Sequence, residues 1–220
     1  MCGRFSQTSS PEVVAEQFGL DDAPLFLKPR YNIAPSQPVA VVRANPESGK
    51  RECVLLRWGL IPSWAKDQAI GYKMINARSE TASEKPAFRG PFRHRRCLIL
   101  ADGFYEWQRE GRRKQPFYIR SKDHRPFAFA GLWDRWEPPG REAVESCTIL
   151  TTEPNDVLRP IHERMPVIVD PQAYGLWLDP TVQQVEAIRP ILRPYPSDRM
   201  TAYPVSLLVN NPLHKPSLPK

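Results

Sequence analysis

The sequence contains no long hydrophobic run, no C-x-x-C pair and no cluster of cysteine and histidine with zinc spacing. The longest apolar runs, such as residues 97–101, are far too short to cross a bilayer, so we expect no membrane contact. The N-terminus has no basic segment followed by an apolar one, so we expect no signal peptide and a cytoplasmic location, at the nucleoid if the source is bacterial. A chain of 220 residues can bury roughly 70% of its unfolded surface, and we expect no structural metal or other cofactor.

Cysteine is scarce, and one of the four cysteines stands apart from the others. Cys53, Cys97 and Cys147 lie in apolar, strand-like stretches, where we expect small buried side chains in a reducing compartment. Cys2 directly follows Met1, and removal of Met1 would leave it with a thiol and a free α-amine on adjacent carbons. That pair can condense with an aldehyde and close a five-membered thiazolidine ring. The alternative is a start codon that happens to precede a cysteine.

Acidic residues are the minority among the charges, because 24 Asp and Glu stand against 31 Lys and Arg, for a net charge of +7. A basic domain often binds a polyanion, although many soluble proteins are simply basic. The arginines gather at residues 88–96 and 109–114. Arginine with interleaved aromatic residues suits phosphates and stacked bases, so this distribution favours a nucleic-acid partner.

Helical patterns are few, and short strand patterns dominate the chain. Ser10 as N-cap, Pro11 at the first helical position and Gly19 as a stop predict a helix over residues 11–18. Further helices are predicted over 171–178 and 182–188. The predicted strands are 38–43, 52–57, 97–101, 103–108, 115–120, 127–136, 146–152 and 165–169, with a hairpin between the first two and a turn at 110–112.

This pattern has no β-α-β rhythm and no internal repeat. It predicts an α+β fold, with a mainly antiparallel, barrel-like β core and a few peripheral short helices. We expect a single domain over residues 1–209 and an irregular tail over 210–220. Nothing in the pattern indicates a coiled coil or a large exposed interface, so we expect a monomer.

Two polar residues stand in segments that are too apolar for ordinary surface loops. Asn76 lies within residues 75–81, and Glu106 lies within residues 101–107. Glu106 has Tyr105 and Trp107 on either side, an environment that would desolvate a carboxylate and raise its pKa. The structural alternatives are that Asn76 caps a turn and that Glu106 pairs with an arginine.

A histidine lies in a third such segment, residues 161–166. His162 has a pKa near neutrality in its ordinary state and can pass protons, and in an extended strand Arg164 would point the same way. The structural alternative is a histidine whose hydrogen bonds are satisfied in the core. Cysteine, asparagine, glutamate and histidine together can form a catalytic group, but spacing alone does not show that they converge.

Six segments in order along the chain give a more specific signal. They are Met1-Cys2-Gly3-Arg4-Phe5, Arg30-Tyr31-Asn32-Ile33-Ala34-Pro35, Arg57-Trp58-Gly59-Leu60-Ile61-Pro62-Ser63-Trp64, residues 75–81, residues 101–107 and residues 161–166. In these segments the chain resembles the SRAP family (SOS response-associated peptidase), also described as abasic-site-processing proteins. They run through most of the chain.

The resemblance implies a sensor of abasic sites in single-stranded DNA that crosslinks to the lesion and shields it from strand cleavage. It implies that Cys2 is the nucleophile, first through its α-amine and then through its thiol. Asn76 would orient the amine, and Glu106 would act as general acid and base while the Schiff base forms and reverses. His162 would assist the opening of the sugar ring by proton transfer. The implied activity is crosslinking and lyase-type chemistry, with autoproteolytic removal of Met1 as an option.

The resemblance also implies a DNA-binding set, namely Arg4, Pro35, Pro62, Trp64, Arg78 and Arg164. Arg78 and Arg164 would clamp phosphates on either side of the lesion. Trp64, with Pro62, would form an apolar wedge against which a flanking base stacks. The chain departs from some relatives at Ala65, where a second aromatic residue would strengthen the stacking.

Two other functions remain open at this level. The first is a cysteine peptidase in which Cys2 works with His162 or Glu106 to cleave peptide bonds, with the Met1–Cys2 bond alone as the narrowest case. The second is a non-catalytic module that binds single-stranded nucleic acid. Crosslinking needs both the free amine and the thiol of Cys2, a peptidase needs chiefly the thiol, and a binding module needs neither.

Overall fold

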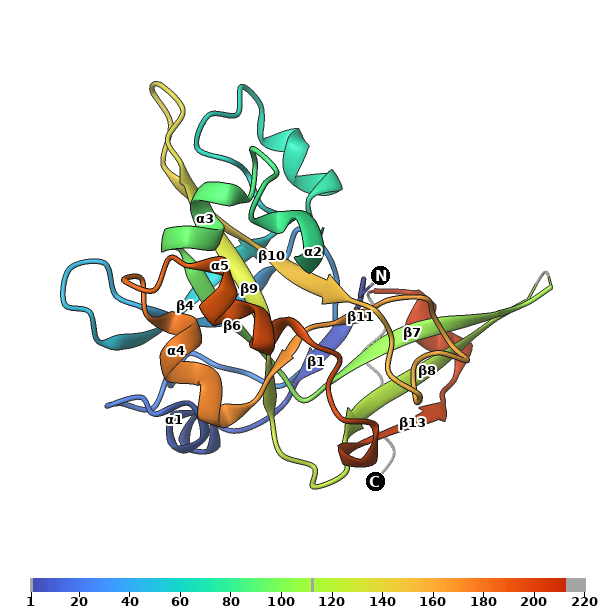
Figure 1. Cartoon of the computed structure of the whole chain (residues 1–220). Helices are drawn as coiled ribbons and strands as arrows, with labels where there is room; N and C mark the ends of the chain where they lie inside the picture. The colour runs from blue at the N-terminus through green and yellow to red at the C-terminus, as the bar shows by residue number, and fades with distance from the viewer. Residues whose placement is uncertain (1, 112, 213–220) are drawn as a thin grey trace.

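Five strands close into a barrel in the part of the chain that the computed structural model describes, residues 2–111 and 113–212 (Figure 1). Around the barrel they follow the order β3, β4, β10, β9 and β6, and the ring closes because β10 pairs with both β4 and β9. All of these pairings are antiparallel except that of β4 with β10. The bounds are Pro38–Ala44 for β3, Arg51–Trp58 for β4, Arg96–Ala101 for β6, Phe127–Trp136 for β9 and Val144–Thr152 for β10. The predicted α+β fold with a barrel-like, mainly antiparallel core is confirmed.

Side chains alternate along the barrel strands between the interior and the outer wall. On β3, Val39 and Val41 belong to the interior cluster, whereas Ala40 and Val42 belong to the cluster beneath the helices. β6 is buried at every position because both of its faces are covered. Strands covered on both faces read as continuous apolar runs, which explains why the sequence locates them so well.

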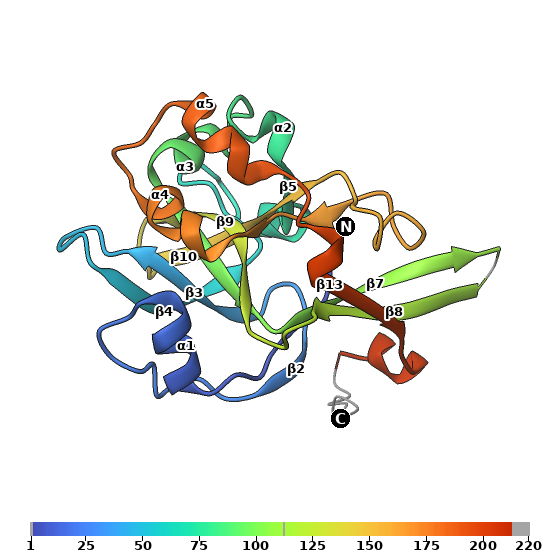
Figure 2. The ribbon, with the colours of Figure 1, turned by 60° about the horizontal axis from the view of Figure 1, so that its bottom comes forward.

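A second sheet carries the N-terminal strand. Its order is β13, β8, β7, β1 and β2, and β7 with β8 forms a hairpin that projects from the body of the molecule (Figures 1 and 2). Because β1 pairs with β7, the N-terminal residues run alongside the residues of β7. The bounds are Phe5–Gln7 for β1, Arg30–Ile33 for β2, Gly103–Glu110 for β7, Arg113–Ser121 for β8 and Met200–Pro204 for β13.

The turn from β6 into β7 fixes the N-terminal segment. The Asp102 carboxylate accepts hydrogen bonds from the backbone N–H groups of Thr8 (2.5 Å) and Ser9 (3.1 Å) and from the Ser9 hydroxyl. Gly103 follows, and a Cβ at this position would lie 2.3 Å from the ring of Tyr118. Only glycine permits this close approach, which keeps β1 against β7.

The helices are short and cover the outside of the barrel. The predicted α1 (Pro11–Phe18) is confirmed: the Ser10 hydroxyl accepts a hydrogen bond from the N–H of Val13, and Gly19 ends the helix with a φ of 63°. Figure 2 shows α3, α4 and α5 gathered on one side of the barrel. The remaining helices and short strands are α2 (Ser79–Ala82), α3 (Arg89–His94), α4 (Tyr174–Leu178), α5 (Val185–Ile188), β5 (Asn76–Arg78), β11 (Met165–Pro166) and β12 (Ile168–Val169), with 3₁₀ turns η1 (Gln68–Lys73), η2 (Pro171–Ala173), η3 (Arg189–Leu192), η4 (Ser197–Arg199) and η5 (Leu207–Asn210).

Three predicted elements differ from the structure. The predicted helix 171–178 divides into η2 and α4, and the predicted helix 182–188 begins only at α5. Asp179 receives hydrogen bonds from the N–H and hydroxyl of Thr181, and this turn leaves residues 182–184 without helical structure. The predicted strand 165–169 divides because β11 pairs with β10, whereas β12 pairs with β9.

Other predictions concern the turn at 110–112 and the tail. Gly111 has a φ of 60°, as a tight turn requires, and residue 112 lies outside the described residues. Asn210, the first residue of the predicted tail, belongs to η5, and residues 213–220 lie outside the described residues. Cys97 and Cys147 are buried and Cys53 is partly buried, all as free thiols.

In the arginine-rich run 88–96, the last residue, Arg96, stabilises the fold. Arg96 is buried and donates from Nε to the carbonyl of Trp177 (2.7 Å) and from Nη1 to the carbonyls of Phe92 (2.8 Å) and Arg93 (3.0 Å). Burial lowers the pKa of Arg96 to about 10, so the side chain remains charged at neutral pH. It therefore ties the ends of α3 and α4 together, where orphan carbonyls need donors.

A second buried arginine closes one end of the barrel. Arg43, on β3, bonds to Glu52 of β4 (2.7 Å) and Glu145 of β10 (3.0 Å), and its guanidinium lies 4.1 Å from the ring centroid of Trp133. Burial opposes the charge of Arg43, but the bonds to the two carboxylates outweigh it and raise the guanidinium pKa. We call Arg43, Glu52 and Glu145 the barrel-end cluster.

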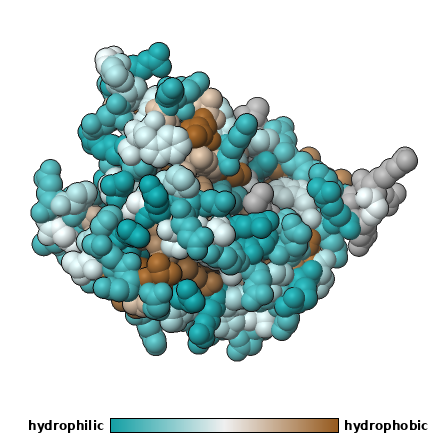
Figure 3. Space-filling view, turned by 45° about the horizontal axis from the view of Figure 1, so that its top comes forward, coloured by the Kyte–Doolittle hydropathy of each residue, from teal (hydrophilic) through white to brown (hydrophobic). Residues whose placement is uncertain are grey.

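The surface shown in Figure 3 is mostly hydrophilic, with hydrophobic residues in separate patches. Within residues 2–111 and 113–212, no helix combines the length and apolar character that crossing a bilayer requires.

Candidate active site

The four residues that the resemblance assigns to catalysis gather at the N-terminal end of β1. The side-chain amide of Asn76 donates to the carbonyl oxygen of Cys2 at 2.8 Å. Glu106 Oε2 lies 4.0 Å from His162 Nε2. The Glu106 carboxyl also acts electrostatically on the Cys2 thiol, which connects the two pairs. Both ribbon views place the segment that leads into β1 between α2 and the β7–β8 hairpin (Figures 1 and 2).

Three different elements position these side chains. Asn76 begins β5, which pairs in parallel with β10 and sets Asn76 opposite Ile149. Glu106 lies on β7, beside β1. His162 lies in the loop that leads to β11, outside the predicted strand 165–169, and its backbone N–H donates to the carbonyl of Leu158 (2.8 Å). The loop brings His162 back toward β7.

Cys2 is fully buried, and its thiol is held in the protonated form. Burial raises the pKa of the thiol far above its ordinary value, and the neighbouring Glu106 carboxyl raises it further. A thiolate nucleophile needs the opposite environment, a positive or polar one that lowers the pKa. The Cys2 sulfur can therefore react only if its proton is transferred as the new bond forms.

Glu106 is 2% exposed, and burial raises the pKa of its carboxyl. The neighbouring His162 lowers the pKa in part. The sequence predicts the raised pKa but gives the wrong cause. Along a strand, Tyr105 and Trp107 face away from Glu106, and they pack in a separate cluster with Val209. The burial of Glu106 comes instead from the face of β7 that looks toward the N-terminus.

The ring of His162 is oriented by the backbone of its own loop. Nδ1 accepts a hydrogen bond from the N–H of Arg164 at 3.0 Å. Nδ1 also lies 3.1 Å from the Arg164 carbonyl oxygen, so the backbone of Arg164 fixes the ring with Nε2 facing Glu106. A proton can pass between the ring and the carboxyl once they approach more closely or share a water molecule.

Asn76 presents a hydrogen-bond acceptor to the same site. Its Oδ1 atom is buried and has no hydrogen-bond partner within residues 2–111 and 113–212, whereas its amide nitrogen binds the Cys2 carbonyl. Buried polar atoms without partners are costly and are often found where a ligand or a reacting group binds. An α-amine on Cys2 would be a suitable donor for this oxygen.

The two arginines predicted as phosphate clamps have different surroundings. Arg78 is exposed at the start of α2 and lies near enough to Glu80 to lower the pKa of that carboxyl. Arg164 makes a bidentate ion pair with Glu80 (2.7 and 2.8 Å) and donates to the carbonyl of Thr151 (2.6 Å). A phosphate that used the same edge of Arg164 would compete with Glu80.

The remaining predicted DNA-binding residues, Trp64, Pro62, Pro35 and Arg4, differ in their exposure. Trp64 is 59% exposed, as a stacking side chain requires, whereas Pro62 is buried and Pro35 is partly buried. Arg4 donates from Nη1 to Asn32 Oδ1 (2.7 Å) and to the carbonyl of Val209 (2.8 Å), so it also ties β1 to η5. Their part in DNA binding stays a prediction.

Sequence reasoning missed two residues that shape the site. Glu80, the ion-pair partner of Arg164, lies in the quoted segment 75–81, but its partner is far away in the sequence. Trp107 lies next to Glu106 and lines two adjoining cavities of about 450 and 490 Å³, which extend from His162 along the hairpin. No group of His, Cys, Asp and Glu that could hold a metal is present among the residues that the structure describes.

Comparisons with known proteins show the family to which the chain belongs. A family model described as SOS response associated peptidase (SRAP) matches residues 1–212. The chain belongs to the SRAP family. Abasic site processing protein YoqW of Bacillus subtilis (strain 168) is 47% identical over 221 residues, covering 96% of this chain and 95% of the relative. Abasic site processing protein HMCES of Xenopus tropicalis is 34% identical, covering 96% of this chain and 75% of the relative.

The fold is also similar to that of a solved structure. The crystal structure of a protein from Bacteroides thetaiotaomicron superimposes with a TM-score of 0.84 at 29% identity, covering 94% of this chain and 93% of that chain. The SRAP fold therefore extends over almost the whole of the chain.

Proposed function

We propose that this SRAP protein processes abasic sites in single-stranded DNA and that it forms a covalent thiazolidine crosslink through Cys2 after Met1 is removed. The observation that carries the proposal is the position of Cys2 between Asn76 and the buried carboxyl of Glu106. The printed names of the relatives, abasic site processing proteins, support the same class of lesion.

The reaction begins with the α-amine of Cys2. The reference pKa of an α-amine is about 7.7–8.0, so a useful fraction is neutral at physiological pH. The neutral amine attacks the aldehyde carbon of the open abasic sugar, and the resulting carbinolamine loses water to give an imine. Loss of water leaves the imine protonated, and the thiol then adds to the imine carbon and gives up its proton as the ring closes. The five-membered ring that closes contains the sulfur, the nitrogen and the former aldehyde carbon.

Glu106 and His162 supply the proton transfers. A neutral Glu106, favoured by its burial, donates a proton to the hydroxyl that leaves as water. The carboxylate that results accepts the proton of the Cys2 thiol as the sulfur attacks the protonated imine, which leaves the ring nitrogen neutral and returns Glu106 to its protonated form. His162, with Nε2 toward Glu106, assists the opening of the sugar ring by proton transfer. Asn76 Oδ1 orients the amine.

The protonated thiol favours crosslinking over a peptidase mechanism. A cysteine peptidase needs a thiolate at neutral pH, and burial beside Glu106 works against that form. Ring closure tolerates a neutral thiol, because the imine is itself a strong electrophile and a base stands beside the sulfur.

Two exposed residues near the site, Trp64 and Arg78, favour the binding of unpaired DNA. The exposed Trp64 offers a stacking face, and Arg78 offers a charge to the phosphates. Because the lesion has no base to read and phosphate contacts dominate, we expect little sequence preference and an affinity that falls as salt rises.

The proposal is tested with single-stranded DNA that contains one abasic site. The mature protein should form a heat-stable adduct, and Cys2→Ala should form none, although its free amine should still form an imine that borohydride traps. A chain with an uncleaved N-terminal extension keeps the thiol but blocks the amine, and it should form neither adduct. A heat-stable adduct from Cys2→Ala in wild-type yield would refute the mechanism.

A further inference from the structure

A basic cleft runs from the site along the β7–β8 hairpin. Its two adjoining cavities, of about 450 and 490 Å³, share Trp107, Arg109 and His162. Each volume lies in the usual range for small-ligand pockets, roughly 300–1,000 Å³. Both ribbon views place the hairpin and α2, which directly follows Arg78, on different sides of the segment that leads into β1 (Figures 1 and 2). The cleft is therefore distinct from the rim near Arg78.

Like charges face each other in this cleft. Arg109 and Lys114 are direct partners across β7 and β8, so their side chains lie on the same face of the hairpin. Such a pair destabilises a hairpin unless an anion compensates it. Neither side chain has a salt-bridge partner among the described residues. Arg159 adds a third positive charge from the loop before β11, although it lies 3.8 Å from the Asp156 carboxylate, and the exposed acid Glu163 lines the same cavity.

An aromatic platform lies beside these charges. Trp107 lines both cavities, and its indole N–H donates to Asn210 Oδ1 at 2.7 Å. The Arg4 guanidinium lies 5.9 Å from the centroid of the same ring. The ring is thus held in place from two sides, and a fixed aromatic face beside paired cations suits a base with its phosphate.

We propose that this cleft binds a nucleotide that flanks the lesion, with the base against Trp107 and the phosphate at Arg109 and Lys114. The inference rests on the proposed function, because the strand must place its lesion at Cys2. Glu106 and His162 line the inner end of the cleft, so a strand with its lesion there continues into the cleft on one side. The occupant is therefore one strand of fixed polarity rather than a free nucleotide.

The test uses oligonucleotides with a tetrahydrofuran analogue of the abasic site, which cannot crosslink, extended only 5′ or only 3′ of the lesion. Wild-type affinity, read by fluorescence anisotropy, should rise about tenfold with one extension, as stacking of a single base can provide. Arg109→Gln with Lys114→Gln should remove most of this gain and reduce the salt slope by about 0.7 for each phosphate that the variant no longer neutralises.

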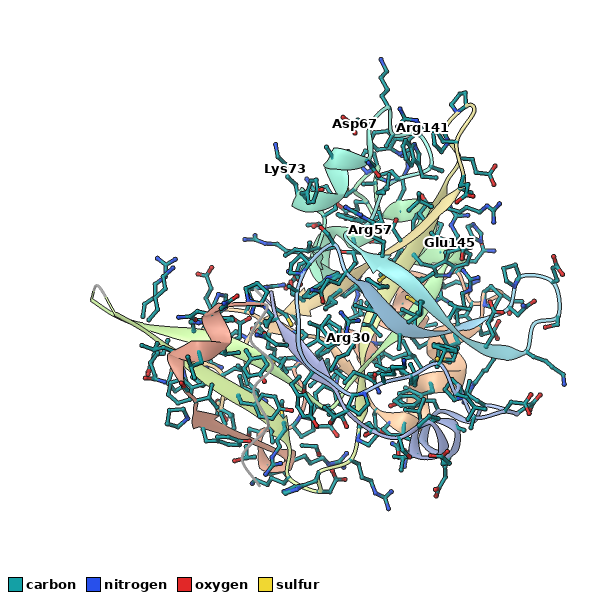
Figure 4. The ribbon with its side chains drawn as sticks, turned by 180° about the vertical axis from the view of Figure 1, so that it is seen from behind. Arg30, Arg57, Asp67, Lys73, Arg141 and Glu145 are labelled. Atoms are coloured by element: carbon teal, nitrogen blue, oxygen red, sulfur yellow. The ribbon has the colours of Figure 1, made fainter. Side chains whose placement is uncertain are left out.

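A matched control removes two charges elsewhere. Lys66 and Arg141 line another cavity, of about 410 Å³, and Figure 4 shows Arg141 beside Asp67 at the end of the molecule far from the hairpin. Lys66→Gln with Arg141→Gln should keep the gain from the favoured extension. The proposed nucleotide site would be refuted if both double variants lost the same part of the affinity gain. It would also be refuted if the 5′ and 3′ extensions raised the wild-type affinity equally.

A second arm tests the stacking. Replacement of the flanking base by a base-less spacer should weaken wild-type binding to about the level of the unextended oligonucleotide. In Trp107→Leu the spacer and the base should bind equally, and a remaining preference for the base would remove Trp107 from the proposal.

Failure of the cleft and failure of the proposed function give different results. An unextended abasic oligonucleotide should form the heat-stable adduct with wild type and with the cleft double variant at saturating concentration. If the adduct forms but binding shows no preference for one extension, the proposed nucleotide site is rejected and the proposed crosslink is not. The opposite result is that wild type prefers one extension and the cleft double variant loses this preference, but no adduct forms. That result rejects the proposed crosslink and supports the proposed nucleotide site in the cleft.

Discussion

Two buried charge clusters lie near opposite ends of β10, and they are built in opposite ways. In the barrel-end cluster, Arg43 bonds to Glu52 and Glu145 at 2.7 and 3.0 Å, and its pKa is raised, which favours the charged form. At the active site, Glu106 lies 4.0 Å from His162, and burial raises the carboxyl pKa, which disfavours the charged form.

This difference in pairing gives the two clusters different roles, one in the stability of the fold and the other in proton transfer. Close pairing holds the barrel-end charges in one protonation state, so they contribute to the fold and cannot exchange protons. Looser pairing leaves Glu106 able to give and accept a proton at an accessible pH, at a cost to stability. We therefore expect mutations in the two clusters to affect different measurements.

The largest expected effect is on crosslinking. Glu106→Gln keeps the shape of the side chain but removes its proton transfer, so the rate of stable adduct formation should fall about 10²–10⁴-fold. The free energy of unfolding at neutral pH should stay the same or rise, because a buried acid is replaced by a neutral amide. Adduct yield is followed on denaturing gels. A rate within threefold of wild type would remove Glu106 from the mechanism.

The barrel-end cluster should show the reverse pattern. Arg43→Met leaves two carboxylates close together without their cation, and it should lower the free energy of unfolding by about 3 kcal/mol or more. Adduct formation per folded molecule should stay within about twofold of wild type. Urea denaturation and the crosslinking assay measure the two quantities. A large loss of crosslinking in well-folded Arg43→Met would show that the clusters are coupled.

A pH series sharpens the comparison. At low pH, Glu106 is protonated in both the folded and unfolded states. As pH rises above about 4.5, the unfolded state ionises first, because the folded carboxyl has a raised pKa. The free energy of unfolding should therefore fall between that pH and the folded pKa, then level off. Glu106→Gln should lack this fall, so its advantage over wild type should grow with pH. Parallel stability curves would contradict the raised pKa.

The smallest effect is expected at the rim, where Glu80 pairs with Arg164. Glu80→Gln should free a guanidinium edge for phosphate and tighten binding of undamaged single strands by about threefold, with a loss of stability of at most about 1 kcal/mol. Glu84→Gln, an exposed neighbour just after α2, removes the same charge and serves as the control. Equal tightening in both variants would mean that only net charge matters.

The sequence predicts the barrel better than it predicts the site. Strand 97–101 is apolar along its length and strand 127–136 is apolar as far as Trp133, because both faces are covered there, and the structure confirms both strands. Short elements such as β5 and β11 have no such pattern, because they exist only through pairing with β10.

The candidate site shows the same limit. Motif resemblance singles out Cys2, Asn76, Glu106 and His162, and only the fold shows that they meet. The pairing of Glu80 with Arg164 joins two distant segments, and no local pattern marks it. Long-range contacts of this kind depend on the register of the sheets, which the sequence does not state.

The most direct test of the central claim is the intact mass of the mature protein after incubation with abasic single-stranded DNA. The account predicts a protein that lacks Met1 and a heat-stable adduct whose mass is the sum of protein and DNA less one water, assigned to Cys2 by fragmentation. A protein that retains Met1 and still forms the adduct, or an adduct on another residue, would contradict it.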